Sequence, residues 1–148
     1  MARHVFFSFH YARDIFRVNQ IRNLPEIVDE AAAGFRDKSL WEESKTKGDA
    51  VIKRLIDNGL VGTSVSVICI GSETAGRRYV DYKIERSIAR GNGMLGVRIH
   101  HLATPHEKGG LPGAIPALLT RHSVPVYTYS DNASLKAWIE AAAKAAGK

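Results

Sequence analysis

The sequence predicts a single α/β domain, residues 1–148, with a flavodoxin-like central sheet of five mostly parallel strands and helices on both faces. Two observations carry this prediction. Apolar runs rich in β-branched residues alternate along the chain with segments of helical periodicity. The clearest case is a strand–helix–strand unit in which strands over Val65–Ile70 and Met94–His101 flank a helix. Short joints favour parallel strands and a right-handed crossover.

The helix of this unit has one apolar face, because its apolar residues recur at four-residue spacing: Val80, Ile84 and Ile88. The strand over Val65–Ile70 is apolar almost throughout, which is typical of a strand buried on both faces. Ligands of such sheets bind beyond the carboxyl ends of the strands. That edge is expected at Gly71 and Ser72 and at the start of the following helix.

The N-terminal half adds a strand and two helices. A strand is expected over His4–His10, and helical spacing over Arg13–Arg22. The segment Ile27–Ala33 is ambiguous between a short helix and a weak edge strand, and we expect short or irregular structure. The polar segment Gly34–Lys47 is too long for a simple connection and is a candidate functional loop. An amphipathic helix over Lys45–Leu60 follows.

The C-terminal third begins with a glycine- and proline-rich loop over Ala103–Ser123, which includes one helical turn. The last strand is expected over Val124–Tyr129, and the proline at its second position indicates an edge strand or a strand start. A final helix over Ala133–Ala146 is expected, capped by Asp131 or Asn132.

The composition excludes several classes of protein. No apolar run approaches the ~20 residues of a membrane span, and the N-terminus does not have the shape of a signal peptide. The lone Cys69 lies in a predicted core strand, so it is expected to be a packed thiol in a cytoplasmic protein. The net charge of +6 favours anionic partners such as nucleotides, but the scattered basic residues do not indicate specific nucleic-acid binding.

The common catalytic and phosphate-binding motifs are absent from the sequence, and no spacing resembles a zinc site. His100 and His101 are adjacent on a predicted strand, so their side chains are expected on opposite faces. The remaining candidates are polar residues at strand ends, Ser8, His10 and Ser72. Trp41 either covers a planar ligand or anchors its loop to the core, and the pattern alone favours the anchor.

Three segments together resemble the TIR-like domain of the bacterial Thoeris antiphage system: RHVFFSFHY from Arg3, GFRDKSLWEE from Gly34, and SVICIGSETAGRRYVDYKIERSIARGNG from Ser66. The resemblance extends from Arg3 to about Leu102. It implies a flavodoxin-like TIR fold and a cytoplasmic enzyme that cleaves NAD, as substrate, at the nicotinamide–ribose bond. In the family the ADP-ribose product is cyclised into a signal that activates a partner effector protein.

The resemblance also implies a substrate pocket and an assembly. The matching pocket residues are Phe7, Ser8, Phe9, His10, Asp37, Trp41, Gly71 and Ser72. The family's active form is a homo-oligomer in which a neighbouring subunit completes the site. It implies no separate cofactor and no metal.

The chain departs from the family at the catalytic position. The family pattern aromatic-Val-x-x-Glu-Ile aligns with Tyr79–Ile84, so that Lys83 occupies the glutamate position. Glu85 is the nearest carboxylate in sequence after it. At ~100° per residue, however, Lys83 and Glu85 lie ~200° apart, on opposite flanks of the apolar stripe.

Two functions therefore remain open. In the first, the chain is a working NAD-cleaving enzyme that uses Glu85 or a carboxylate of Glu42 and Glu43. In the second, it is a TIR fold that binds a nucleotide or a protein and turns over poorly, because Lys83 opposes the positive charge that develops on the ribose. A receiver-like domain is disfavoured because no acidic cluster ends the first strand.

Overall fold

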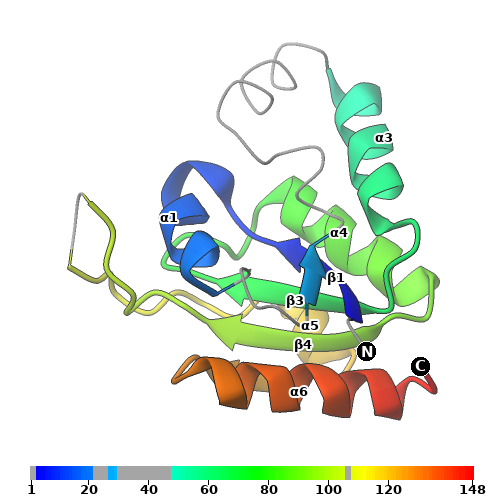
Figure 1. The fold of residues 1–148 in the computed structure, drawn as a ribbon. Coiled ribbons are helices and arrows are strands. Elements are labelled where there is room, and N and C mark those ends of the chain that lie inside the picture. Colours follow the sequence, from blue (N-terminus) through cyan, green and yellow to red (C-terminus); the bar gives the residue numbers. More distant parts are fainter. Residues whose placement is uncertain (1–2, 22–26, 30–47, 106–107) are drawn as a thin grey trace.

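The computed structural model describes residues 3–21, 27–29, 48–105 and 108–148. These residues contain one five-stranded sheet in the order β2-β1-β3-β4-β5, in which every neighbouring pair is parallel (Figure 1). The strands are β1 (Arg3–Ser8), β2 (Ile27–Asp29), β3 (Val65–Ile70), β4 (Gly93–Arg98) and β5 (Val126–Thr128). This is the strand order of flavodoxin-like sheets, as the alternation of the sequence predicts.

Helices cover both faces of the sheet. They are α1 (Tyr11–Ile21), α3 (Asp49–Leu60), α4 (Arg78–Ala89), α5 (Ala117–Arg121) and α6 (Asn132–Ala145). Buried side chains of α1 and α6 pack on one face, and those of α3, α4 and α5 pack on the other. Figure 1 shows α6 lying along β4, with which it makes extensive contact.

The alternation of β1 divides its side chains between these two layers. Val5 and Phe7 pack with α1 and α6, whereas Phe6 packs with Ile56 and Leu60 of α3. All six residues of β3 are buried, which fits a sequence that is apolar except at Ser66. The sheet therefore has two apolar cores, and β1 and β3 contribute to both of them.

The order of the strands creates a switch point between β1 and β3. These neighbours pair in register, with Phe7 opposite Val67 and Ser8 opposite Ile68. From β1 the chain passes to β2 on one side, and it then crosses to β3 on the other side. The crevice beyond the carboxyl ends of such a strand pair is where ligands of doubly wound sheets bind.

A network of hydrogen bonds between buried polar side chains fixes α4 to the sheet. Ser66 of β3 donates from Oγ to Ser87 Oγ of α4 at 2.8 Å, and Ser87 donates to the carbonyl oxygen of Lys83 at 2.7 Å. The amide of Asn92 donates to Ser66 at 3.1 Å and to Thr63 at 3.0 Å. Because these side chains are buried, the network specifies how α4 is rotated about its axis.

Most expected elements are confirmed. The ambiguous segment forms the short strand β2, β5 lies at the sheet edge directly after Pro125, and Asp131 caps α6 through the Ser134 N–H. Cys69 is a buried thiol, as expected. In the described part of the chain, no helix is long and apolar enough to cross a membrane.

One expectation about β4 is wrong. The strand ends at Arg98 rather than His101, so the alternation of side chains does not extend to the two histidines. Instead of pointing to opposite faces, the rings of His100 and His101 lie 5.3 Å apart, edge to face. His101 Nε2 lies 2.8 Å from the Tyr129 carbonyl oxygen, which ties this turn to the end of β5.

Candidate functional site

The carboxyl end of β1 leads directly into α1. The His10 carbonyl oxygen accepts the Asp14 N–H at 2.9 Å, so the helix starts within three residues of Ser8. Ser8 is fully buried, and among the described residues its Oγ has no hydrogen-bond partner. A buried hydroxyl in that state is costly unless something outside the described residues bonds to it, so Ser8 is a candidate ligand contact.

The end of β3 lies against α1. A Cβ atom on Gly71 would lie 2.2 Å from Oδ2 of Asp14, so only glycine fits at this position. The Gly71 N–H donates to Thr74 Oγ1 at 2.8 Å, and Thr74 is fully buried. The structure thus places the β1–α1 and β3–α4 connections side by side at the switch point.

A buried ion pair on α1 supports this edge. Arg17 donates to Asp14 Oδ1 at 3.0 Å, and both side chains are 0% exposed. Arg17 also donates from Nε to the Leu102 carbonyl oxygen at 2.8 Å, which connects α1 to the segment after β4. The sequence signal for this pair was available, since Asp14, Arg17 and Ile21 have the spacing of one helix face, but we did not predict it.

The loop after β4 closes the same edge. Ser72 donates from Oγ to the Leu111 carbonyl oxygen. A Cβ atom on Gly113 would lie 2.3 Å from the Gly71 carbonyl oxygen, and Arg98 donates to the Gly113 carbonyl oxygen at 3.2 Å. Ser72 is therefore engaged by the loop, and Gly113 is a glycine because the backbone of the β3 end lies against it.

Lys83 lies at this edge as well. Its Nζ is 5.8 Å from the centre of the Phe9 ring, and Phe9 follows β1 and is 7% exposed. Desolvation by burial lowers the pKa of Lys83 from 10.5 to about 8, although Cys69 acts in the opposite direction. With that pKa, about nine-tenths of the Lys83 side chains are still charged at pH 7. Glu85, by contrast, is exposed.

The sequence of this site matches a known family. Residues 6–104 match the model of the family described as Thoeris protein ThsB, TIR-like domain. The chain belongs to this family. The match includes the carboxyl end of β1, together with α1, β3, α4 and β4, but it does not include the loop around Leu111 and Gly113 that closes the edge.

A relative of this TIR-like chain comes from Bacillus cereus (strain MSX-D12) and is named "Putative cyclic ADP-D-ribose synthase ThsB1". It is 49% identical over 102 residues, which make up 68% of this chain and 53% of the relative. The TIR-like chain thus spans about half the length of the curated relative that it matches.

Most of the site residues that the resemblance implies in this TIR-like chain lie at the switch-point edge. Ser8, Phe9, His10, Gly71 and Ser72 lie at the carboxyl ends of β1 and β3, with Lys83 beside them. Phe7 is instead part of the core between the sheet and α1 and α6. Asp37 and Trp41, and the acidic pair Glu42 and Glu43, lie outside the described residues.

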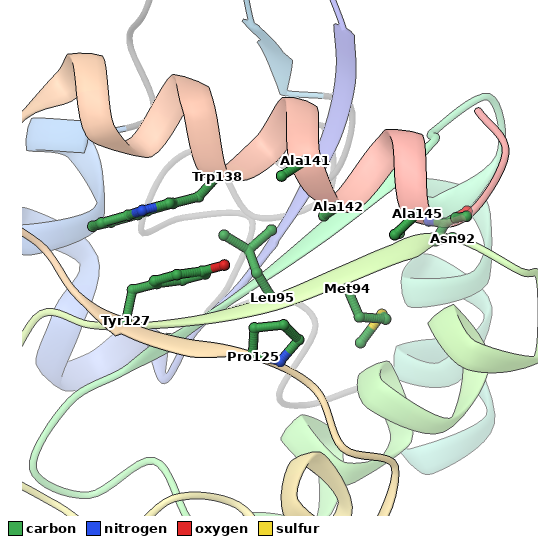
Figure 2. Close-up of a pocket in the computed structure, with 11 residues that line it drawn as sticks. Asn92, Met94, Leu95, Pro125, Tyr127, Trp138, Ala141, Ala142 and Ala145 are labelled. Carbon is green, nitrogen blue, oxygen red and sulfur yellow. The ribbon is translucent and has the colours of Figure 1, made fainter.

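A cavity of about 400 Å³ lies at the other end of the sheet. Figure 2 shows it between α6 and the start of β4, with Leu95, Pro125 and alanines of α6 in its wall and the Tyr127 and Trp138 rings stacked 4.4 Å apart. Its lining has no charged side chain that could bind a phosphate, and it lies at the amino ends of the strands. This cavity of the TIR-like chain is therefore distinct from the switch-point edge.

No group of three or more histidine, cysteine, aspartate or glutamate side chains in the described ranges is placed to hold a metal ion. The arrangement at the switch point instead offers a buried hydroxyl, helix N-termini and an ammonium group, which are groups that bind anionic ligands.

Proposed function

We propose that this chain is the TIR domain of a Thoeris antiphage-defence protein that binds NAD or an ADP-ribose-type nucleotide at the β1–β3 switch point and cleaves NAD only weakly. One observation carries the proposal. At the position of the family's glutamate, Lys83 extends to within 5.8 Å of the Phe9 ring centre, while Glu85 is exposed to solvent.

The groups at this edge suit a dinucleotide. The N-terminus of α1 follows β1 directly, and a helix N-terminus favours phosphate because its first N–H groups lack helical partners. Ser8 supplies a buried hydroxyl for a ribose or phosphate oxygen. The Lys83 ammonium can pair with a phosphate as a point charge. The Asp14–Arg17 pair holds the surrounding backbone in place.

The same ammonium disfavours cleavage. When the bond between nicotinamide and ribose breaks, nicotinamide leaves as a neutral molecule and positive charge remains on the ribose carbon. A carboxylate beside that carbon stabilises the charge, whereas an ammonium destabilises it. In a partly dehydrated site this difference amounts to several kcal/mol, on the order of a thousandfold in rate. Lys83 therefore predicts slow turnover.

A second candidate is full synthesis of a cyclic ADP-ribose-type signal, and the printed name of the Bacillus cereus relative favours it. In that case the chain works in the cytoplasm as a homo-oligomer and activates an effector protein through the diffusible product. A carboxylate must then face the ribose. It comes from Glu85 after a rotation of α4, from Glu42 or Glu43, or from a neighbouring subunit.

Two measurements on the purified chain test the proposal. Calorimetric titration with ADP-ribose is expected to show binding that Ser8→Ala weakens several-fold. Ser64→Ala is the matched control, since Ser64 lies before β3 at the opposite end of the sheet, and it should leave the affinity unchanged. Chromatography of NAD incubations is expected to show little free nicotinamide.

The outcomes separate the two candidates. Rapid release of nicotinamide that Glu85→Gln abolishes would support the second candidate over the first. If ADP-ribose does not bind and no nicotinamide appears, the edge is not a nucleotide site in this chain.

A further inference from the structure

The residues that the structure describes at the switch-point edge include three cationic side chains that are buried or half-buried. Lys83, Arg17 and Arg98 lie there. The described carboxylates at the edge are Asp14, which is buried, and Glu73, which is exposed and pairs with Arg77. Asp14 and Arg17 form an ion pair, so their two charges balance each other, and Lys83 and Arg98 remain in the sum. The sum of these charges favours ligands with more negative charge.

We propose that this edge selects against the pyridinium cation of NAD⁺, so that NADH and ADP-ribose bind more tightly than NAD⁺, and that Lys83 is the selecting residue. The inference rests on the proposed nucleotide site. It adds a preference among ligands that share an adenosine diphosphate moiety and differ in charge.

The chemistry of the three ligands isolates the effect. NAD⁺ and NADH have almost the same shape, but the pyridinium ring of NAD⁺ is positively charged and the dihydropyridine ring of NADH is neutral. ADP-ribose lacks the ring altogether. NAD⁺ therefore has one negative charge in total at neutral pH, whereas NADH and ADP-ribose each have two.

The position of Lys83 determines the expected size of the preference. A second unit charge about 6 Å from an ammonium group, at an effective dielectric constant of about 40, changes the affinity about tenfold. The Phe9 ring shields one side of the ammonium from water, since Phe9 is buried and lies 5.8 Å from Nζ. Both effects place the preference above the error of a calorimetric titration.

The test is a set of titrations of the full chain with NAD⁺, NADH and ADP-ribose. If nicotinamide release is detected, carba-NAD⁺, which keeps the pyridinium charge and resists cleavage, replaces NAD⁺. We expect NADH and ADP-ribose to bind about tenfold more tightly than NAD⁺. In Lys83→Met the ratio between NADH and NAD⁺ should approach one, and in Lys83→Glu it should reverse.

A charge control uses Lys144, which is exposed in the last turn of α6. Lys144→Glu makes the same change in net charge as Lys83→Glu and should leave the ratio unchanged. If the unaltered chain binds NADH and NAD⁺ equally, and Lys83→Met weakens both equally, Lys83 binds a phosphate and the inference is wrong while the proposed function stands. If none of the three ligands binds, the proposed function fails with it.

Discussion

The Lys83 Nζ of α4 lies 5.8 Å from the centre of the Phe9 ring, although the two residues are far apart in the sequence. The Ser66–Ser87 hydrogen bond fixes the rotation of α4 that brings them together, because Ser87 is one helical turn after Lys83 and faces the sheet. Lys83, which the resemblance places at the family's glutamate position, therefore lies at the edge of the sheet, and the proposed function depends on that placement.

Burial of Lys83 makes stability depend on pH in a defined direction. Its pKa falls from 10.5 to about 8 on folding, so between these values the unfolded chain binds more protons and stability rises with pH. Below pH 8 the charged side chain costs up to about 3 kcal/mol relative to a neutral one. Lys83→Met removes this cost.

The measurement is urea unfolding at several pH values between 7 and 11. The difference in unfolding free energy between Lys83→Met and the unaltered chain should shrink as the pH rises. Subtracting the two curves removes the contribution of the tyrosines, such as Tyr82 and Tyr129, whose pKa values burial raises. A difference that stays constant over this range would show that the Lys83 pKa is not lowered.

The contact between Gly71 and Asp14 makes a second prediction. Gly71→Ala places a methyl group 2.2 Å from the Asp14 carboxylate, and we expect a loss of about 2–3 kcal/mol in unfolding free energy. Gly62→Ala is the control, because nothing lies within 4 Å of a Cβ there and its φ of +82° costs only about 1 kcal/mol. Equal losses in the two variants would mean that the β3 end and α1 are not in contact.

The buried hydrogen-bond network between α4 and the sheet gives a third prediction. Ser66→Ala removes the acceptor of Asn92 and the donor to Ser87, which should destabilise the fold by about 1–3 kcal/mol. Ser64→Ala is a matched control, since Ser64 is more exposed and its hydroxyl makes one 3.5 Å contact with the His4 carbonyl oxygen. Thermal unfolding of the two variants compares them directly, and a loss no larger in Ser66→Ala than in the control would contradict the network.

The sequence predicts those parts of the fold that local patterns specify. The β-branched run at Val65–Ile70 is a fully buried strand, and the stripe of Val80, Ile84 and Ile88 faces the sheet. These succeed because strand and helix periodicities depend on neighbouring residues alone. The strand order follows from the alternation of elements together with the rule for crossovers.

Local sequence patterns do not predict contacts between segments that are far apart in the sequence. The end of β4 at Arg98, which brings His100 and His101 together, depends on the pairing partner β5, whose strand stops at Thr128. The fit of Gly113 against the Gly71 backbone likewise depends on how a loop folds back over the sheet. No spacing within one segment encodes these relationships.

The site was predicted in outline because the carboxyl ends of neighbouring parallel strands meet at one edge. Ser8 and Gly71 could be placed there in advance, whereas the Asp14–Arg17 pair was missed because charged side chains on a helix are usually exposed. The roles of Asp37 and Trp41 remain predictions, since both lie outside the described residues.

The most direct measurement is the initial rate of nicotinamide release from NAD by the unaltered chain and by Lys83→Glu, at equal concentration and pH. The account predicts that the unaltered chain is slow and that the substitution accelerates release at least about tenfold, because a carboxylate then faces the developing positive charge. Fast release by the unaltered chain, with no gain in Lys83→Glu, would contradict it.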